Sequence, residues 1–164
     1  MDPNNIDNLN INYSKQILEA VKGLGTTGKI GYYPRNKYLY IKTQDEYNLN
    51  AFGILSEEGF ELAPSWNKPG GPKSHISLVN GFELDNLLLR DDANKIYKKY
   101  KDVDIGFQLN DVQFENQLDK NTQRRKIVCF LIVESKIIVG IRSELNLEET
   151  PYFKLHISLC SKLL

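Results

Sequence analysis

Cysteine, histidine and tryptophan are scarce in this chain, whose 164 residues include two cysteines, two histidines and one tryptophan. Both cysteines, Cys129 and Cys160, lie in apolar runs typical of strands, so we expect buried free thiols in a reducing compartment. A disulfide between them is the alternative. Two cysteines and two histidines at these spacings match no zinc-binding pattern, and the sequence therefore predicts neither a metal site nor another cofactor.

An excess of charge of either sign is also missing. Lys and Arg together number 21, as do Asp and Glu, so the formal net charge is zero. Binding to a long nucleic-acid duplex draws on many uncompensated basic residues, so we do not expect such a duplex as the main partner. A small nucleotide or an RNA end needs only a local positive cleft, and the charge balance permits one.

Long apolar runs are absent too, and none approaches the length needed to span a bilayer. Residues 1–10 are polar and rich in Asn, and they have neither the basic start nor the apolar stretch of a signal peptide. We therefore expect a cytoplasmic or nuclear monomer that has no membrane partner.

The remaining composition is that of an ordinary globular protein, with 41% hydrophobic and 26% charged residues. We expect one bilobal domain over residues 1–164, with residues 1–12 as a loose lead-in. Apolar periodicity predicts helices over 14–24, 45–58 and 85–101, and strands over 29–33, 37–43, 103–109, 112–115, 126–134 and 152–160. Residues 136–147 fit both types, because the run 137–139 is β-branched whereas Ile138, Ile141 and Leu145 have helical spacing.

One hexapeptide occurs twice, as Lys-Ser-His-Ile-Ser-Leu over 73–78 and as Lys-Leu-His-Ile-Ser-Leu over 154–159, 81 residues later. Both copies have the character of strands, and side chains alternate between the two faces of a strand. His75 and Ser77 therefore share one face, and so do His156 and Ser158. The repeat predicts an α+β fold with two pseudo-twofold-related lobes, in which antiparallel sheets line a central cleft and helices lie outside.

The two His-x-Ser-Leu motifs resemble those of the 2H phosphoesterase superfamily, which is defined by two H-x-[ST]-[apolar] motifs about half a chain apart. The resemblance covers residues 29–160 and implies a 2′-5′ RNA ligase-like fold. It also implies a phosphodiesterase that needs no metal, in which one histidine accepts a proton from the attacking oxygen and the other donates one to the leaving oxygen. His75, His156, Ser77 and Ser158 would be catalytic, with the serines bound to the phosphate oxygens.

Five further residues are candidate ligands of the substrate. Lys73, Lys154 and Arg142 would supply positive charge. Tyr152 would stack on a base or bond to the phosphate, and Trp66 would offer a second ring for stacking. Exposed strand-end lysines and a packing tryptophan are the competing explanations for three of these residues.

Three substrates remain open: an RNA end or 2′,3′-cyclic phosphate, a 2′-5′ oligoadenylate, and a cyclic oligonucleotide. One alternative function is a non-catalytic module that binds a nucleotide or an RNA end in the same cleft. A metal hydrolase with both histidines as ligands is another, although no pattern of carboxylates supports it.

Overall fold

Eight strands form one antiparallel sheet in the computed structural model, which describes residues 4–33, 38–80, 83, 85, 90–119, 121–149 and 154–164. The strands are β1 (Thr27–Tyr33), β2 (Tyr38–Lys42), β3 (Glu61–Leu62), β4 (His75–Val79), β5 (Ile105–Gly106), β6 (Gln108–Leu118), β7 (Arg125–Glu134) and β8 (His156–Leu163). The helices are α1 (Ile6–Leu9), α2 (Lys15–Val21), α3 (Glu46–Leu55), α5 (Arg90–Tyr100) and α6 (Lys136–Glu144). Short helical turns cover Asn10–Ser14, Ser56–Glu58 and Pro64–Asn67. The α+β prediction is confirmed.

Apart from β3 and β5, the strand order is symmetric about the pairing of β4 with β8. It runs β5-β1-β2-β4-β8-β7-β6, with β3 paired to β8. Each half consists of a hairpin, a helix and a histidine strand, as β1-β2-α3-β4 and as β6-β7-α6-β8. Where the sequence predicted separate sheets, the two halves are joined in one sheet by the pairing of Ile76 in β4 with Ile157 in β8. Because equivalent residues of the repeat lie opposite each other, a local twofold axis passes through this pair.

The helix of each half packs on the histidine strand of the other half. α3 lies against β8, and α6 lies against β4. The apolar members of both motifs, Ile76, Leu78, Ile157 and Leu159, are fully buried on this side of the sheet. The histidines and serines are therefore left on the opposite face, as strand alternation predicts.

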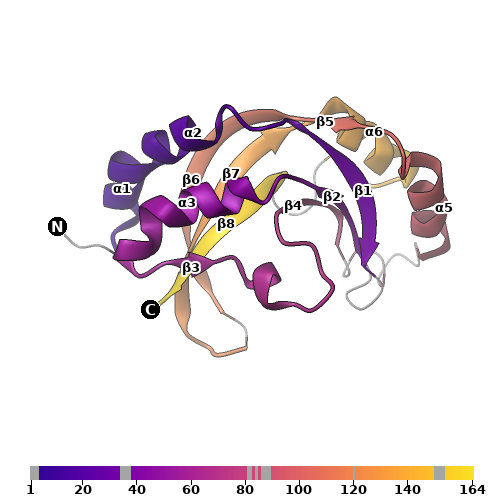
Figure 1. Cartoon of the computed structure of the whole chain (residues 1–164). Coiled ribbons are helices and arrows are strands. Elements are labelled where there is room, and N and C mark those ends of the chain that lie inside the picture. The colour runs from indigo at the N-terminus through magenta and orange to yellow at the C-terminus, as the bar shows by residue number, and fades with distance from the viewer. Residues whose placement is uncertain are drawn as a thin grey trace.

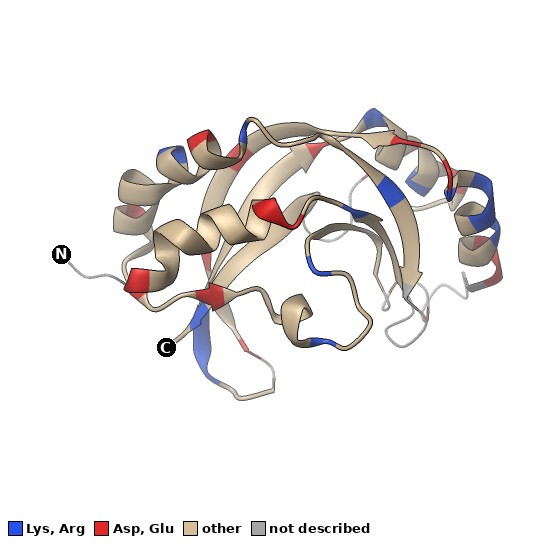
Figure 2. Cartoon of the chain, in the orientation of Figure 1, with Lys and Arg blue, Asp and Glu red and all other residues tan. Residues whose placement is uncertain are grey.

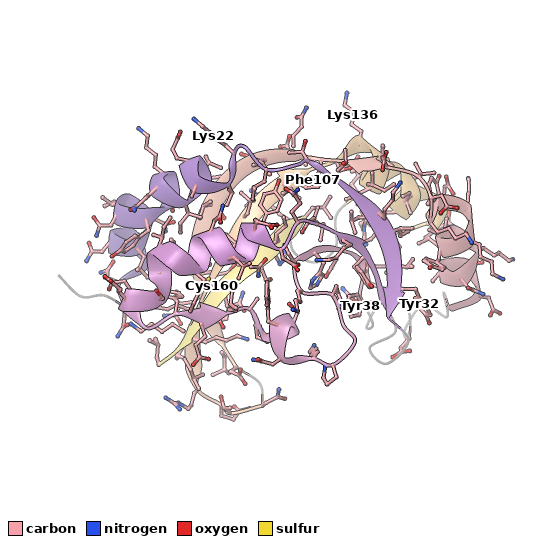
Figure 3. All side chains as sticks on the ribbon, viewed as in Figure 1. Lys22, Tyr32, Tyr38, Phe107, Lys136 and Cys160 are labelled. Atoms are coloured by element: carbon pink, nitrogen blue, oxygen red, sulfur yellow. The ribbon has the colours of Figure 1, made fainter. Side chains whose placement is uncertain are left out.

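A short connection curves the sheet into the arch seen in Figure 1. β5 pairs with β1 at one edge of the sheet, and β6 pairs with β7 at the other edge. Only Phe107 separates β5 from β6, so the chain passes from one edge to the other within a single residue (Figure 3). Phe107 is buried, and its backbone N–H donates to the Thr26 carbonyl at 3.0 Å. The two edges are thus held close together at this end of the strands.

The N-terminal region differs from the prediction of a loose lead-in. Helical structure begins at α1, where the Asn5 side chain accepts hydrogen bonds from the backbone N–H groups of Asp7 and Asn8. Leu9 is buried, so this segment contributes to the core despite its polar composition. Ser14, the first residue of the predicted helix 14–24, lies inside this helical stretch, and its Oγ donates to Asn10 Oδ1 at 3.0 Å.

The ambiguous segment 136–147 contains the helix α6. The Ser135 side chain caps it by accepting a hydrogen bond from the backbone N–H of Ile138 at 3.2 Å. Helical spacing buries Ile138, Ile141 and Leu145 on one side, whereas Ile137 stays exposed. The period of the apolar residues therefore outweighs the strand preference of the β-branched run.

Charged residues of both signs are mixed over the surface, as Figure 2 shows. The lysines of α5 are exposed, and Lys99 pairs with Glu144 at 3.1 Å. Cys129 and Cys160 lie opposite each other in β7 and β8 as buried free thiols, as predicted, and burial raises the pKa of Cys160 to about 12. None of the helices in the described residues is long and apolar enough to cross a membrane.

Candidate active site

The two motifs form one block of four polar side chains at the centre of the sheet. The antiparallel pairing of Ile76 with Ile157 places His75 opposite Ser158, and Ser77 opposite His156, in the flanking positions. Side chains directly opposite on one face lie roughly 5 Å apart at Cβ, and diagonal neighbours lie roughly 7–8 Å apart. The histidines occupy one diagonal and the serines the other. This spacing leaves room for a phosphate group between the imidazoles.

The backbone fixes both imidazoles in the same way. His75 Nδ1 lies 3.3 Å from the carbonyl of Lys73, and His156 Nδ1 lies 2.7 Å from that of Lys154, two residues upstream in each case. Because a carbonyl only accepts, each Nδ1 carries the proton and donates it. In the neutral ring the lone pair is then on Nε2, which has no hydrogen-bond partner among the described residues. Each Nε2 is therefore able to accept a proton or, when the ring is charged, to donate one.

The surroundings lower the pKa of both histidines, and more strongly for His75. Burial lowers the pKa of His75 to about 4. The hydrogen bond to the Lys73 carbonyl favours the charged ring and opposes this shift, but it is the smaller effect. The positive charge of His156 lowers the pKa of His75 further, since the two rings lie near each other on one face of the sheet. Burial also lowers the pKa of His156, but the Lys154 carbonyl and the nearby carboxylate of Glu115 oppose the shift. The two rings thus differ in their readiness to hold a proton.

Aromatic rings flank the block on both sides. The ring centroids of Tyr38 and Tyr40 lie 6.0 and 5.9 Å from that of His75, and Phe130 lies 5.2 Å from His156. Tyr40 and Phe130 occupy equivalent positions of the two halves, opposite the motif serines. A β-carbon at Gly31 would lie 2.4 Å from the Tyr40 ring, so the glycine lets this ring lie across β1.

A hollow of about 500 Å³ opens beside His156 on the same face. Its lining combines apolar and polar side chains. It is lined by Ala63, Pro64, Gln113, Glu115, Gln117, Lys126, Val128, Phe130, Ile132, Lys154, His156, Ser158, Cys160 and Ser161. A second hollow of about 860 Å³, toward the start of α6, shares Ile132 and Lys154 with the first. Lys154 therefore stands between the two.

Comparison with known families identifies this arrangement. The family model described as Swiss Army Knife, 2H phosphoesterase domain, matches residues 39–162, which include both motifs and the strands on either side of them. The chain belongs to the 2H phosphoesterase family. The resemblance inferred from the two motifs is therefore confirmed, and with it a phosphoesterase-type function. No curated protein and no solved structure matches the chain.

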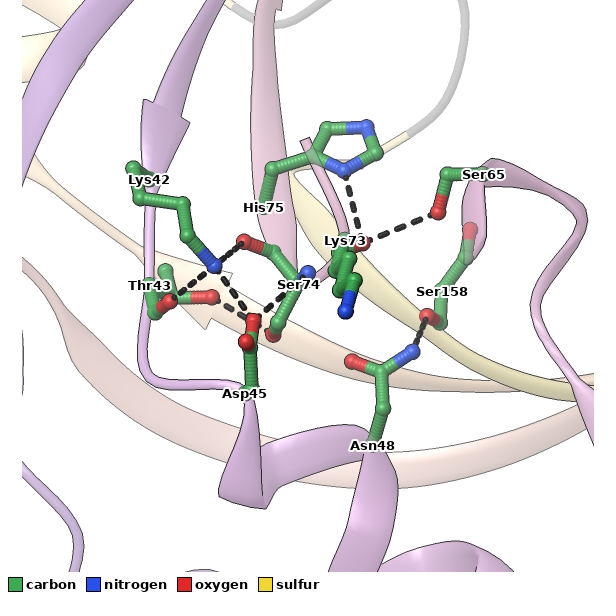
Figure 4. Close-up of polar contacts among 9 residues, drawn as sticks. All are labelled: Lys42, Thr43, Asp45, Asn48, Ser65, Lys73, Ser74, His75 and Ser158. Carbon is green, nitrogen blue, oxygen red and sulfur yellow. Dashed lines mark hydrogen bonds and ion pairs between the residues drawn. The ribbon is translucent and has the colours of Figure 1, made fainter. Parts of the chain in front are cut away.

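In this 2H phosphoesterase, a polar network holds the backbone just before His75 (Figure 4). The Asp45 carboxylate accepts hydrogen bonds from Lys42 Nζ and from the backbone N–H of Ser74, the latter at 3.4 Å. Thr43 Oγ1 and Ser74 Oγ share a buried hydrogen bond of 2.7 Å. Burial alone would raise the pKa of Asp45, but the hydrogen bond and charge of Lys42 outweigh it and lower the pKa. Lys42 lies opposite His75 in the ladder, so this ion pair borders the site.

Two of the predicted substrate ligands contact each other. Lys73 Nζ lies 5.0 Å from the centroid of the Trp66 ring, so the ammonium covers one face of the indole. Ser65 Oγ donates to the Lys73 carbonyl at 2.9 Å, which ties the preceding loop to the start of β4. The Lys73 ammonium thus packs on the Trp66 ring, while the exposed Lys154 lines both hollows. Tyr152 lies outside the described residues.

Arg142 does not lie with the block of motif histidines and serines. Its guanidinium is fully buried and pairs with the Glu83 carboxylate through hydrogen bonds of 3.1 and 2.8 Å. It also donates to the Leu78 carbonyl at 2.7 Å and to the Glu148 carbonyl at 2.8 Å. With its donors committed inside the protein, Arg142 is not a substrate ligand, which corrects the expectation from sequence.

Several residues of the site were not predicted from sequence: Tyr40, Glu115, Phe130, and Asn48, whose amide donates to the Ser158 carbonyl at 2.9 Å. A signal existed for Glu115, because Gln113, Glu115 and Gln117 alternate along one face of β6. Nothing in the sequence indicated that this face borders His156. Among the described residues, no group of three or more His, Cys, Asp or Glu side chains is placed to hold a metal ion.

Proposed function

We propose that this chain is a metal-independent phosphodiesterase that cleaves a small or terminal nucleotide phosphodiester by acid–base catalysis with His75 and His156. The observation that carries the proposal is the block of two histidines and two serines on one face of β4 and β8. In-line displacement at phosphorus needs a base and an acid on opposite sides, and the diagonal arrangement of the imidazoles supports this requirement.

His75 is the base in this proposal, because its low pKa keeps the ring neutral. Its Nε2 accepts the proton of an attacking hydroxyl or water while that oxygen forms a bond to phosphorus. His156, supported by the Glu115 carboxylate, donates the Nε2 proton to the leaving oxygen as the bond from phosphorus to that oxygen breaks. Each positioned proton transfer contributes roughly 10²–10⁴-fold to the rate.

Ser77 and Ser158 stabilise the negative charge on the non-bridging oxygens of the phosphate in this mechanism. Each hydroxyl lies next to the histidine of the other strand and has a proton to donate to a non-bridging oxygen. Lys154 adds positive charge at the rim of the site. The serines thus bind the group being transferred, while the histidines act on the oxygens that enter and leave.

The hollow beside His156 is the proposed seat of one nucleoside of the substrate. Its volume of about 500 Å³ exceeds that of a single base, and Phe130 provides an apolar floor. Stacking of a base on an aromatic ring is worth roughly 1–3 kcal/mol. The amides of Gln113 and Gln117 also line it and would meet the edge of a base.

A panel assay tests the function and selects the substrate. The purified chain is incubated with 2′,3′-cyclic nucleotides, 2′-5′ and 3′-5′ oligonucleotides and cyclic dinucleotides, with and without EDTA, and the products are read by mass. We expect cleavage of at least one class at a rate that EDTA does not change. Binding of a nucleotide without any product would contradict the proposed activity and favour a nucleotide-binding module. Loss of activity in EDTA would contradict the metal-independent mechanism.

A further inference from the structure

Both histidine strands contain a β-bulge at the same point of the motif. In β4 the ladder with β2 skips Leu78, the residue after Ser77. In β8 the ladder with β7 skips Leu159, the residue after Ser158. A bulge turns the side chains beside it and leaves the extra residue without its ladder partner. The orientation of each motif serine therefore depends on a point of the strand where a ladder partner is missing.

A buried polar side chain reaches each bulge from the helix of the other half. Asn48 of α3 donates through Nδ2 to the backbone carbonyls of Ser158 and Leu159, at 2.9 and 3.1 Å (Figure 4). Arg142 of α6 donates through Nη1 to the carbonyl of Leu78 at 2.7 Å. Both side chains are 0% exposed. The two bulges are thus held by equivalent contacts that cross between the halves.

Packing alone does not account for Asn48. Its amide oxygen is buried and has no hydrogen-bond partner among the described residues. Leaving such an atom unpaired is unfavourable, so what favours asparagine at this position is the pair of hydrogen bonds from Nδ2 to the bulge carbonyls. The equivalent position of α6, three residues after the capping residue, is the buried apolar Ile138. The fold therefore accepts an apolar side chain at this place in a helix.

Arg142 is held rigidly enough to act as a fixed donor. The Glu83 carboxylate binds two of its nitrogens, and the Glu148 carbonyl binds a third. A buried guanidinium requires such partners, since an unpaired charge in the interior is strongly unfavourable. Arg142 thus links the bulge in β4 to residue 83 after that strand and to the loop that follows α6.

We propose that Asn48 and Arg142 are positioning residues that fix the backbone at the two bulges and so aim the motif serines and histidines at the phosphate. The proposal rests on the proposed function for its effect on turnover. Each helix sets the geometry of the motif that belongs to the other half. Catalysis then requires the two halves to be packed together correctly, because the helix of each half positions the motif of the other.

Asn48→Leu tests the proposal, with Asn50→Leu as the matched control. Asn50 lies on the same helix and its amide also donates to a carbonyl, that of Ala20 at 3.0 Å, away from the bulges. We expect Asn48→Leu to lower kcat about 10²-fold, since small misplacements of catalytic groups have effects of this size. KM should change less than kcat, because the proposed seat of the nucleoside beside Phe130 is not altered. Asn50→Leu should retain the wild-type kcat.

The ring signals of the two histidines in ¹H–¹⁵N spectra provide a readout that does not need turnover. Asn48→Leu should displace the signals of His156 in a folded protein, and Asn50→Leu should not. Unchanged ring signals together with wild-type kcat in Asn48→Leu would overturn the proposal. If Asn48→Leu does not fold, the isosteric Asn48→Asp, which also lacks the donor when ionised, takes its place with the same two readouts.

The same spectra separate the two levels of the inference. If the wild-type chain cleaves nothing in the panel, the proposed function fails, while displaced ring signals in the Asn48 variant still support the positioning role. Arg142→Lys extends the test to the other bulge, because it keeps the charge but loses the forked donors. We expect this variant to lower kcat as well, and an unaltered kcat would remove Arg142 from the proposal.

Discussion

The rate of cleavage should depend on pH in a way that the unequal environments of the two histidines determine. In the free enzyme the reaction needs neutral His75 and protonated His156. Burial holds the pKa of His75 near 4, so this ring is almost entirely neutral above pH 6. Burial also holds the pKa of His156 below its ordinary value of 6.5, so its proton is lost on the alkaline side.

The size of the effect follows from these two titrations. Both required forms coexist between about pH 4 and the pKa of His156, which lies below 6.5, and kcat/KM should pass through its maximum in that window. Above pH 6.5 the protonated fraction of His156 falls about tenfold for each pH unit, and kcat/KM should fall with it. The Glu115 carboxylate raises the pKa of His156, so Glu115→Gln should move the alkaline limb to lower pH.

Initial rates of the best panel substrate, measured from pH 3.5 to pH 9 at constant ionic strength, give the profile. Circular dichroism at each pH shows that the fold is retained. A kcat/KM that stays constant or rises between pH 6.5 and pH 9 would refute the assignment of His156 as the acid. An alkaline limb that Glu115→Gln leaves in place would refute the role of that carboxylate.

Three further outcomes are expected. Glu83→Gln removes the countercharge of the buried Arg142 and should lower the free energy of unfolding in urea by about 3–5 kcal/mol, whereas an unchanged value would contradict the buried pair. The unfolded chain binds a proton at His75 more readily than the folded one, so unfolding free energy should fall by up to about 3 kcal/mol from pH 6.5 to pH 4, and His75→Ala should abolish this part of the slope. Ser77→Ala and Ser158→Ala should each lower kcat about 10²–10³-fold, and a wild-type kcat would exclude the serine concerned from binding the phosphate.

Which side chains of each motif strand face the core was predictable, because side chains alternate between the two faces of any strand. Period two separates His75 from Ile76 whatever the rest of the chain does, and the structure buries the isoleucine and leaves the histidine facing the cleft. The repeat likewise indicated a twofold relation, since two strands with nearly the same sequence present similar surfaces. That β4 and β8 pair directly, with Ile76 opposite Ile157, depends on the packing of the whole sheet.

The residues that surround the motifs depended on contacts that are distant in sequence. Arginine is usually a surface residue. Arg142 is buried because it pairs with Glu83, which is 59 residues away along the chain. Asn48 reaches Ser158 across 110 residues. No local pattern distinguishes these side chains from exposed ones. The charge of Arg142 therefore suggested a substrate ligand, whereas in the structure it makes contacts inside the protein.

The turnover of His75→Ala and of His156→Ala on one defined substrate tests the central claim most directly, namely that two imidazoles transfer protons on opposite sides of one phosphorus. Each variant should fold like the wild type and lose at least about 10²-fold in kcat. His75→Ala should lose the acidic limb of the pH profile, and His156→Ala the alkaline limb. Wild-type turnover in either folded variant would contradict the account.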